Sequence, residues 1–136
     1  YGGSRGAVVS SMVATHYSDL KGVILKSGVY DLAKASESYS WFNPIKLTML
    51  WEIGSLVEEQ LKSRSAFFFA DQIKAPLLII HGTKDDRADI ESAKLFANKV
   101  NSSGGYAELI SIESEHIIPM SMIEPYMDIF FKKALK

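Results

Sequence analysis

The sequence predicts an α/β fold in which helices cover a sheet of parallel strands, and two observations support this prediction. Three short apolar segments, at about residues 22–28, 76–81 and 106–112, have the composition of buried strands. Helical segments lie between and around them, so the order along the chain is helix, strand, helices, strand, helix, strand, helix. Such alternation is typical of a parallel sheet with right-handed crossovers.

The first half of the chain is expected to contain one strand between two helical regions. Small apolar residues over 5–16 predict a helix that packs closely against the sheet and is buried on most sides. The strand at 22–28 ends at a glycine, and residues 30–44, which are rich in aromatic side chains, are expected to be irregular. Residues 45–62 are expected to be helical, with an interruption at Gly54.

The second half has the clearer pattern. A continuous apolar run enters through Pro76 and suits a parallel strand that is covered on both faces. Asp89 is expected to cap a helix whose apolar positions keep helical spacing as far as Val100. A turn at 102–105 leads into the strand at 106–112, and a last helix is expected over about 121–133.

Composition excludes several classes of function. The chain has 47% hydrophobic and 23% charged residues, as an ordinary globular protein does. A formal net charge of -1 gives no basis for nucleic acid or an anionic membrane as a partner, and no apolar run approaches the length of a membrane span. Without cysteine there is no disulfide, thiolate metal site or cysteine nucleophile. His81 and Asp85 with Asp86 could bind an ion, but no further ligand has a suitable spacing, so we expect neither a metal nor a cofactor. The lack of cysteine suits a reducing compartment and favours a cytoplasmic location, although the sequence fixes none.

The chain opens on Gly2-Gly3-Ser4-Arg5-Gly6, a G-x-S-x-G motif. In α/β folds this motif forms a sharp strand-to-helix turn that exposes a nucleophilic serine. We expect the backbone at Ser4 to be strained and to leave no room for a Cβ atom at Gly2 or Gly6. The alternative is a glycine-rich loop that binds a phosphate through its backbone amides.

An acid and a histidine follow at positions that favour the nucleophile. Asp85 comes just after the strand that ends near His81, and His116 follows the next strand on a polar loop. Both are expected at the carboxyl edge of the sheet, where α/β proteins bind ligands. The order Ser4, Asp85, His116 is that of the α/β-hydrolases. His116 would take the proton of Ser4, Asp85 would orient the imidazole, and the backbone N–H of Arg5 would supply one donor of an oxyanion hole.

Other residues compete for two of these roles. His16 is expected to be a surface or packing residue on the first helix, and His81 to make a local hydrogen bond at its strand end. Asp89 is better explained as a helix cap, and Asp86 as a turn or ion-pair residue.

The sequence resembles the catalytic domain of the prolyl oligopeptidase family over essentially its whole length. The motifs that carry the resemblance are Gly2–Gly6, Trp51–Gly54, Arg64-Ser65, Asp71–Arg87 and Glu115-His116, of which the segment from Asp71 to Arg87 is the most specific. The resemblance implies an α/β-hydrolase fold, a triad of Ser4, Asp85 and His116, and a serine hydrolase that forms an acyl-enzyme. Its substrate would be a peptide; a small ester, as for a carboxylesterase or a dienelactone-hydrolase-like enzyme, is the alternative.

The position of the motif predicts that residues 1–136 are the C-terminal half of such a domain, beginning at the nucleophile and lacking the N-terminal strands. Tyr1-Gly2-Gly3 is expected to be too short for a strand, which would leave an apolar edge at 22–28 open to association with the missing half or another partner. A second oxyanion donor would also be absent, and losing one donor costs roughly 100- to 1,000-fold in rate. A catalytically inactive fragment is therefore the third hypothesis.

Overall fold

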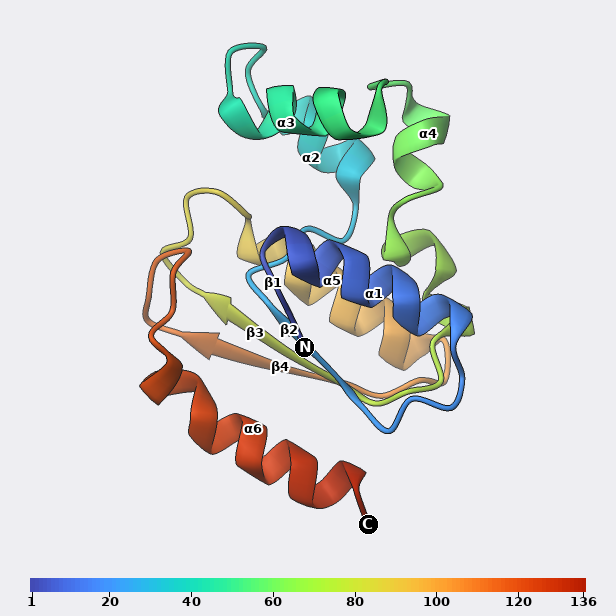
Figure 1. Cartoon of the computed structure of the whole chain (residues 1–136), viewed down its shortest axis with the longest axis vertical. Coiled ribbons are helices and arrows are strands. Elements are labelled where there is room, and N and C mark those ends of the chain that lie inside the picture. Colours follow the sequence, from blue (N-terminus) through green and yellow to red (C-terminus); the bar gives the residue numbers. More distant parts are fainter.

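The computed structural model describes all 136 residues as a parallel sheet covered by helices on both faces (Figure 1). The four strands lie in the order β1-β2-β3-β4, and every neighbouring pair is parallel. The strands are β1 (Gly2–Gly3), β2 (Val23–Lys26), β3 (Leu77–Gly82) and β4 (Ala107–Ile112). The helices are α1 (Arg5–His16), α2 (Leu32–Ser38), α3 (Pro44–Ile53), α4 (Glu58–Lys62), α5 (Ile90–Ser102) and α6 (Met120–Ala134), with a 3-10 segment at Ala66–Gln72.

The central strands are apolar on both sides because both faces of the sheet are covered. Leu77 and Ile79 of β3 belong to a core cluster that includes residues of α1 and α5, such as Phe96. Leu78 and Ile80 point to the other face, where they pack with residues of α6. Figure 1 shows α1 and α5 on one side of the sheet and α6 on the other. All six residues of β3 are buried, as the continuous apolar run predicted.

The sheet has a fourth strand that the sequence did not predict. Gly2 pairs with Leu25 and Gly3 with Lys26, so β1 lies alongside the end of β2. The expectation that Tyr1-Gly2-Gly3 forms no strand is therefore wrong. A ladder of backbone hydrogen bonds needs no side chain, and the apolar composition by which strands are recognised is missing from two glycines.

The region between β2 and β3 is more helical than expected. Residues 30–44 contain α2, whose first turn is capped by Asp31: its carboxylate accepts from the backbone N–H of Lys34 at 3.1 Å. An aspartate at this position is a helix-start signal, and the expectation of an irregular segment overlooked it. The helix expected over 45–62 divides into α3 and α4 at Gly54, which adopts the left-handed conformation with φ 74°. In Figure 1, α2, α3 and α4 stand apart from the sheet beyond α1.

Helix α1 is less buried than its small apolar residues suggested. Ala7 and Ala14 are fully buried against the sheet, but Val9 is 60% exposed and Val13 is 39% exposed. These valines face the space between α1 and the helices α2 and α3, where a cavity lies. None of the helices is both long and apolar enough to cross a lipid bilayer.

Tyr30 anchors the core under α5. Its ring is fully buried and stacks on Phe96 with ring centroids 4.5 Å apart. Its hydroxyl lies against the backbone of Gly28 and makes no hydrogen bond of good geometry. Burial raises the pKa of the Tyr30 phenol far above its usual value.

We expect Tyr30→Phe to leave the free energy of unfolding at pH 7 unchanged or to raise it by about 1 kcal/mol, because the variant no longer buries a hydroxyl that lacks a well-formed hydrogen bond. The native state keeps Tyr30 protonated, whereas the unfolded chain ionises it near pH 10, so this residue makes the protein less stable as the pH rises above about 10. The variant should lose less stability there. Urea unfolding at pH 7 and about pH 10.5 measures both effects, with Tyr17→Phe as an exposed control. A loss of stability at pH 7 would contradict this account.

Candidate active site

Ser4 occupies a strained turn between β1 and α1. Its backbone has φ 51° and ψ -116°, a conformation that residues with a side chain rarely adopt. Both of its backbone polar groups are used: the N–H donates to Lys26 O at 2.7 Å, and the carbonyl accepts from Ala7 N at 3.0 Å. The turn is thus fixed between β2 and the first turn of α1, and it presents the serine side chain above the sheet.

The two glycines of the motif have different roles. A Cβ atom at Gly2 would lie 2.2 Å from the carbonyl oxygen of Gly6, which is far too close. At Gly6 nothing lies within 4 Å of the position of a Cβ atom, and this residue lines the cavity. The expectation that both positions exclude a Cβ is therefore correct for Gly2 and wrong for Gly6, because only the strand side of the turn is crowded.

The structure brings Ser4, His116 and Asp85 together in one chain of hydrogen bonds. Ser4 Oγ lies 2.8 Å from His116 Nε2. On the other side of the ring, Nδ1 lies 2.9 Å from each carboxylate oxygen of Asp85. A carboxylate only accepts hydrogen bonds, so Nδ1 carries the hydrogen in the tautomer that fits these contacts, and Nε2 can accept from the hydroxyl.

Asp85 is held by the turn that follows β3. Its side chain is fully buried, and Oδ1 accepts from the backbone N–H groups of Arg87 and Ala88, both at 2.9 Å. The carboxylate is thereby fixed in orientation before it meets the histidine. Neighbouring Asp86 is exposed, and Asp89 caps α5 by accepting from Glu91 N at 3.0 Å, so neither competes with Asp85.

The loop that carries His116 is packed tightly on the ends of β2 and β3. Ser27 Oγ donates to the backbone carbonyl of His116 at 3.0 Å, and Ser27 itself has a positive φ of 51°. A Cβ atom at Gly82 would lie 2.4 Å from Ser114 O, so glycine is required where the loop crosses β3. Lys84 N also donates to Ser114 O at 3.0 Å. Ser27 and Gly82 were not predicted as site residues. Their positions at the carboxyl ends of predicted strands could have indicated that they lie at the site.

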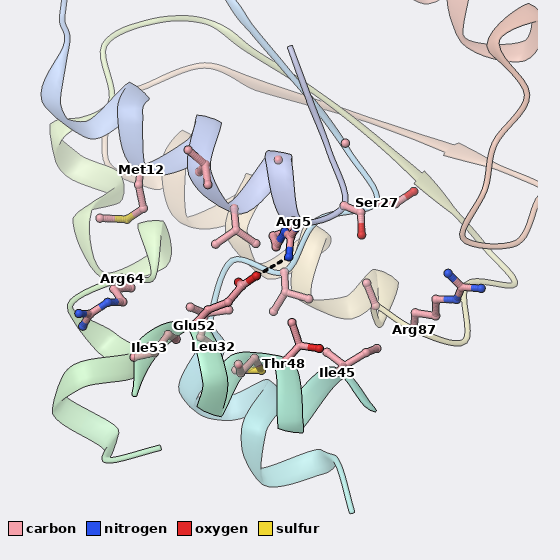
Figure 2. A pocket seen from close by; sticks show the side chains of 18 of the residues that line it. Arg5, Met12, Ser27, Leu32, Ile45, Thr48, Glu52, Ile53, Arg64 and Arg87 are labelled. Atoms are coloured by element: carbon pink, nitrogen blue, oxygen red, sulfur yellow. Dashed lines mark hydrogen bonds and ion pairs between the residues drawn. The ribbon is translucent and has the colours of Figure 1, made fainter. Parts of the chain in front are cut away.

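A cavity of about 1000 Å³ lies beside Ser4 and His116, between α1 and the helices α2 and α3. Half of its 24 lining residues are hydrophobic, among them Val9, Met12 and Met49. Figure 2 shows Arg5 of α1 and Glu52 of α3 facing each other across it, where the guanidinium and the carboxylate form an ion pair. The Arg5 side chain had no predicted role. The cavity thus has a mainly apolar lining that includes one ion pair.

The aromatic residues between β2 and β3 do not line this cavity, apart from Tyr39, whose hydroxyl donates to Arg87 O at 2.5 Å. Burial, together with the charges of Asp85 and Asp89, raises the pKa of Tyr39. Tyr39 therefore stays a hydrogen-bond donor and joins the end of α2 to the turn of Asp85. Trp41, Phe42 and Trp51 point to solvent: they are 68%, 90% and 89% exposed.

The remaining histidines lie outside the hydrogen-bond chain of Ser4. His16 ends α1, where Nδ1 is 2.9 Å from Met12 O, and its ring lines the far part of the cavity. His81 is fully buried, and its Nε2 is 2.8 Å from Ala88 O, the local hydrogen bond that its strand-end position predicted. No group of three or more side chains is arranged to hold a metal ion.

The strand order, the strained serine turn and the Ser4–His116–Asp85 arrangement are those of an α/β-hydrolase fold. The chain belongs to the prolyl oligopeptidase family, whose family model matches residues 1–130. This confirms the resemblance that the motifs indicated.

Solved structures show the same fold. An acylaminoacyl peptidase from Pyrococcus horikoshii matches with a TM-score of 0.82 and 23% identity, covering 99% of this chain and 23% of that protein. A puromycin-hydrolyzing peptidase from Mycobacterium tuberculosis matches with a TM-score of 0.84 and 19% identity, covering 96% of this chain and 21% of that protein. An esterase from Pyrococcus furiosus matches with a TM-score of 0.67 and 17% identity, covering 97% of this chain and 51% of that protein. The chain thus spans about a quarter of the length of the first of these proteins. A search of curated protein sequences finds no significant match.

The two glycines of the motif give a matched pair of variants. Gly2→Ala should destabilise the protein by about 2 kcal/mol or more, because the methyl group would overlap the carbonyl of Gly6. Gly6→Ala should stabilise it by up to about 1 kcal/mol, because alanine is favoured over glycine within a helix and this position is open. Thermal unfolding of both variants measures the difference, and equal destabilisation by the two would refute the asymmetry of the turn.

Proposed function

We propose that this chain supplies the nucleophile, base and acid of a serine hydrolase that cleaves peptide bonds through an acyl-enzyme. The observation that carries the proposal is the unbroken hydrogen-bond chain from Ser4 Oγ through His116 to the buried carboxylate of Asp85. The strained turn at Ser4 supports it, since strain at a single exposed serine is typical of a nucleophile position.

Each residue has a defined part in the reaction. His116 Nε2 accepts the proton of Ser4 as Oγ forms a bond to the substrate carbonyl carbon. Asp85 stabilises the imidazolium that results, and the backbone N–H of Arg5, in the first turn of α1, donates to the oxyanion. His116 then gives the proton to the leaving group as the bond to carbon breaks. Water, activated by the same imidazole, releases the acyl group from Ser4.

A peptide is the favoured substrate class. Family membership supports it, and so do the printed names of two neighbours, an acylaminoacyl peptidase and a puromycin-hydrolyzing peptidase. The mainly apolar cavity beside Ser4 suits an apolar side chain of the substrate. An esterase also shares the fold, so hydrolysis of a small ester is the alternative outcome.

The test compares a peptide p-nitroanilide with a p-nitrophenyl ester, using the full gene product. We expect both to be hydrolysed, and Ser4→Ala or His116→Ala to lower kcat by about 10⁴-fold or more. Asp85→Asn should cost about 10⁴-fold, because the imidazole would take the wrong tautomer. Asp86→Asn, in the same turn but exposed, is the matched control and should keep wild-type kcat.

The outcomes separate the hypotheses. Turnover of the ester alone would replace the peptidase with an esterase. A wild-type protein that hydrolyses neither substrate, or a Ser4→Ala variant as active as the wild type, would overturn the serine hydrolase.

A further inference from the structure

We propose that His81 is a positioning residue that holds the carboxylate of Asp85 toward His116. This inference rests on the proposed function, because it assigns a role in orienting the acid of that reaction. His81 is the second-to-last residue of β3, its side chain is fully buried, and its Nε2 lies 3.3 Å from Asp85 Oδ2.

The hydrogen bonds of Asp85 show why a further contact with its second oxygen matters. Oδ1 accepts from Arg87 N and Ala88 N, both at 2.9 Å, so this oxygen is held by the backbone. Oδ2 has no backbone donor and is approached by the two histidines alone. With His81 removed, Oδ2 would keep only its contact with His116, and the two backbone bonds to Oδ1 alone would resist rotation of the carboxylate about its Cβ–Cγ bond.

The surroundings of His81 define which ring nitrogen acts. Nε2 lies 2.8 Å from the carbonyl oxygen of Ala88 as well as 3.3 Å from Asp85 Oδ2, and both atoms can only accept. Nε2 therefore carries the hydrogen and donates it to Ala88 O, while Asp85 Oδ2 lies close beside the same N–H group. Nδ1 is buried without any partner, so a hydrogen there would be an unsatisfied donor.

This arrangement connects the acid to a fully buried strand of the sheet. All residues of β3 are buried, and β3 is paired on both sides, with β2 and with β4. One imidazole on this strand contacts both the start and the end of the turn, at Asp85 and Ala88. The turn is thereby closed around the carboxylate that His116 needs.

The test uses three variants in the full gene product. His81→Leu keeps the bulk but loses the donor, and His81→Gln places an amide N–H near the position of Nε2. Ile80→Val, at a buried neighbour on β3 whose side chain is apolar, controls for loss of stability alone. We expect His81→Leu to lower kcat by about 10- to 100-fold with little change in KM, which is the size of loss seen when a residue that orients a functional side chain is removed. His81→Gln should recover most of the loss, and Ile80→Val should keep wild-type kcat.

A second readout does not depend on turnover. The hydrogen on His116 Nδ1, bonded to a buried carboxylate, should give a far-downfield proton resonance that is retained in His81→Gln and Ile80→Val and lost or shifted in His81→Leu. Should His81→Leu fail to fold, His81→Gln decides: a retained resonance supports the proposal, and a lost one overturns it.

Wild-type kcat in folded His81→Leu, or an equal loss in His81→Gln and His81→Leu, would also overturn it. A wild-type protein without hydrolase activity would refute the proposed function, while the resonance would still test His81.

Discussion

The parallel pairing of β3 with β4 is the constraint on which the rest of the site depends. The two strands are in register to their last residues, where Gly82 pairs with Ile112, and the ladder continues as Thr83 N donates to Ile112 O at 2.8 Å. Asp85 leaves one strand and His116 the other within a few residues of this point. Two side chains that are 31 residues apart in the sequence thus begin from adjacent positions. The close approach of Gly82 to the His116 loop then fixes the height of the imidazole above the sheet.

The serine is brought to the same edge by different means. Strand β1 pairs over two residues only, and Ser4 N donates to Lys26 O at 2.7 Å, so a short ladder on β2 sets where the turn lies. The residue that follows β2, Ser27, donates to the backbone carbonyl of His116, so the end of β2 positions the nucleophile and the base together. Positive φ at both Ser4 and Ser27 costs of order 1–3 kcal/mol each. The fold can hold this strain because both residues are fixed by backbone hydrogen bonds to neighbouring strands.

The sequence predicted the parts of the molecule that depend on local pattern. Residue type and spacing account for the buried run of β3, the cap at Asp89, the break at Gly54 and the placing of Asp85 and His116 after strands.

The sequence could not predict β1, because its two glycines carry no strand signal, and our interpretation of the sequence overlooked the Asp31 cap that begins α2. The burial of α1 was overestimated because a stripe of small apolar residues can face a cavity as well as a core. The Arg5–Glu52 pair and the contact of His81 with Asp85 join segments whose distance is set only by the tertiary fold. The roles of Ser4, Asp85 and His116 remain predictions that the geometry supports, and the role of the Arg5 amide remains a prediction that rests on its place at the start of α1.

The central claim is that the fold sets Ser4 apart from the other serines as an activated nucleophile. The most direct measurement is peptide mass spectrometry of the full gene product after treatment with a fluorophosphonate, which reacts with serines activated by an adjacent base. The account predicts a single stoichiometric adduct on Ser4, reduced to background in His116→Ala. An adduct on another residue, or unchanged labelling of Ser4 when His116 is replaced, would contradict it.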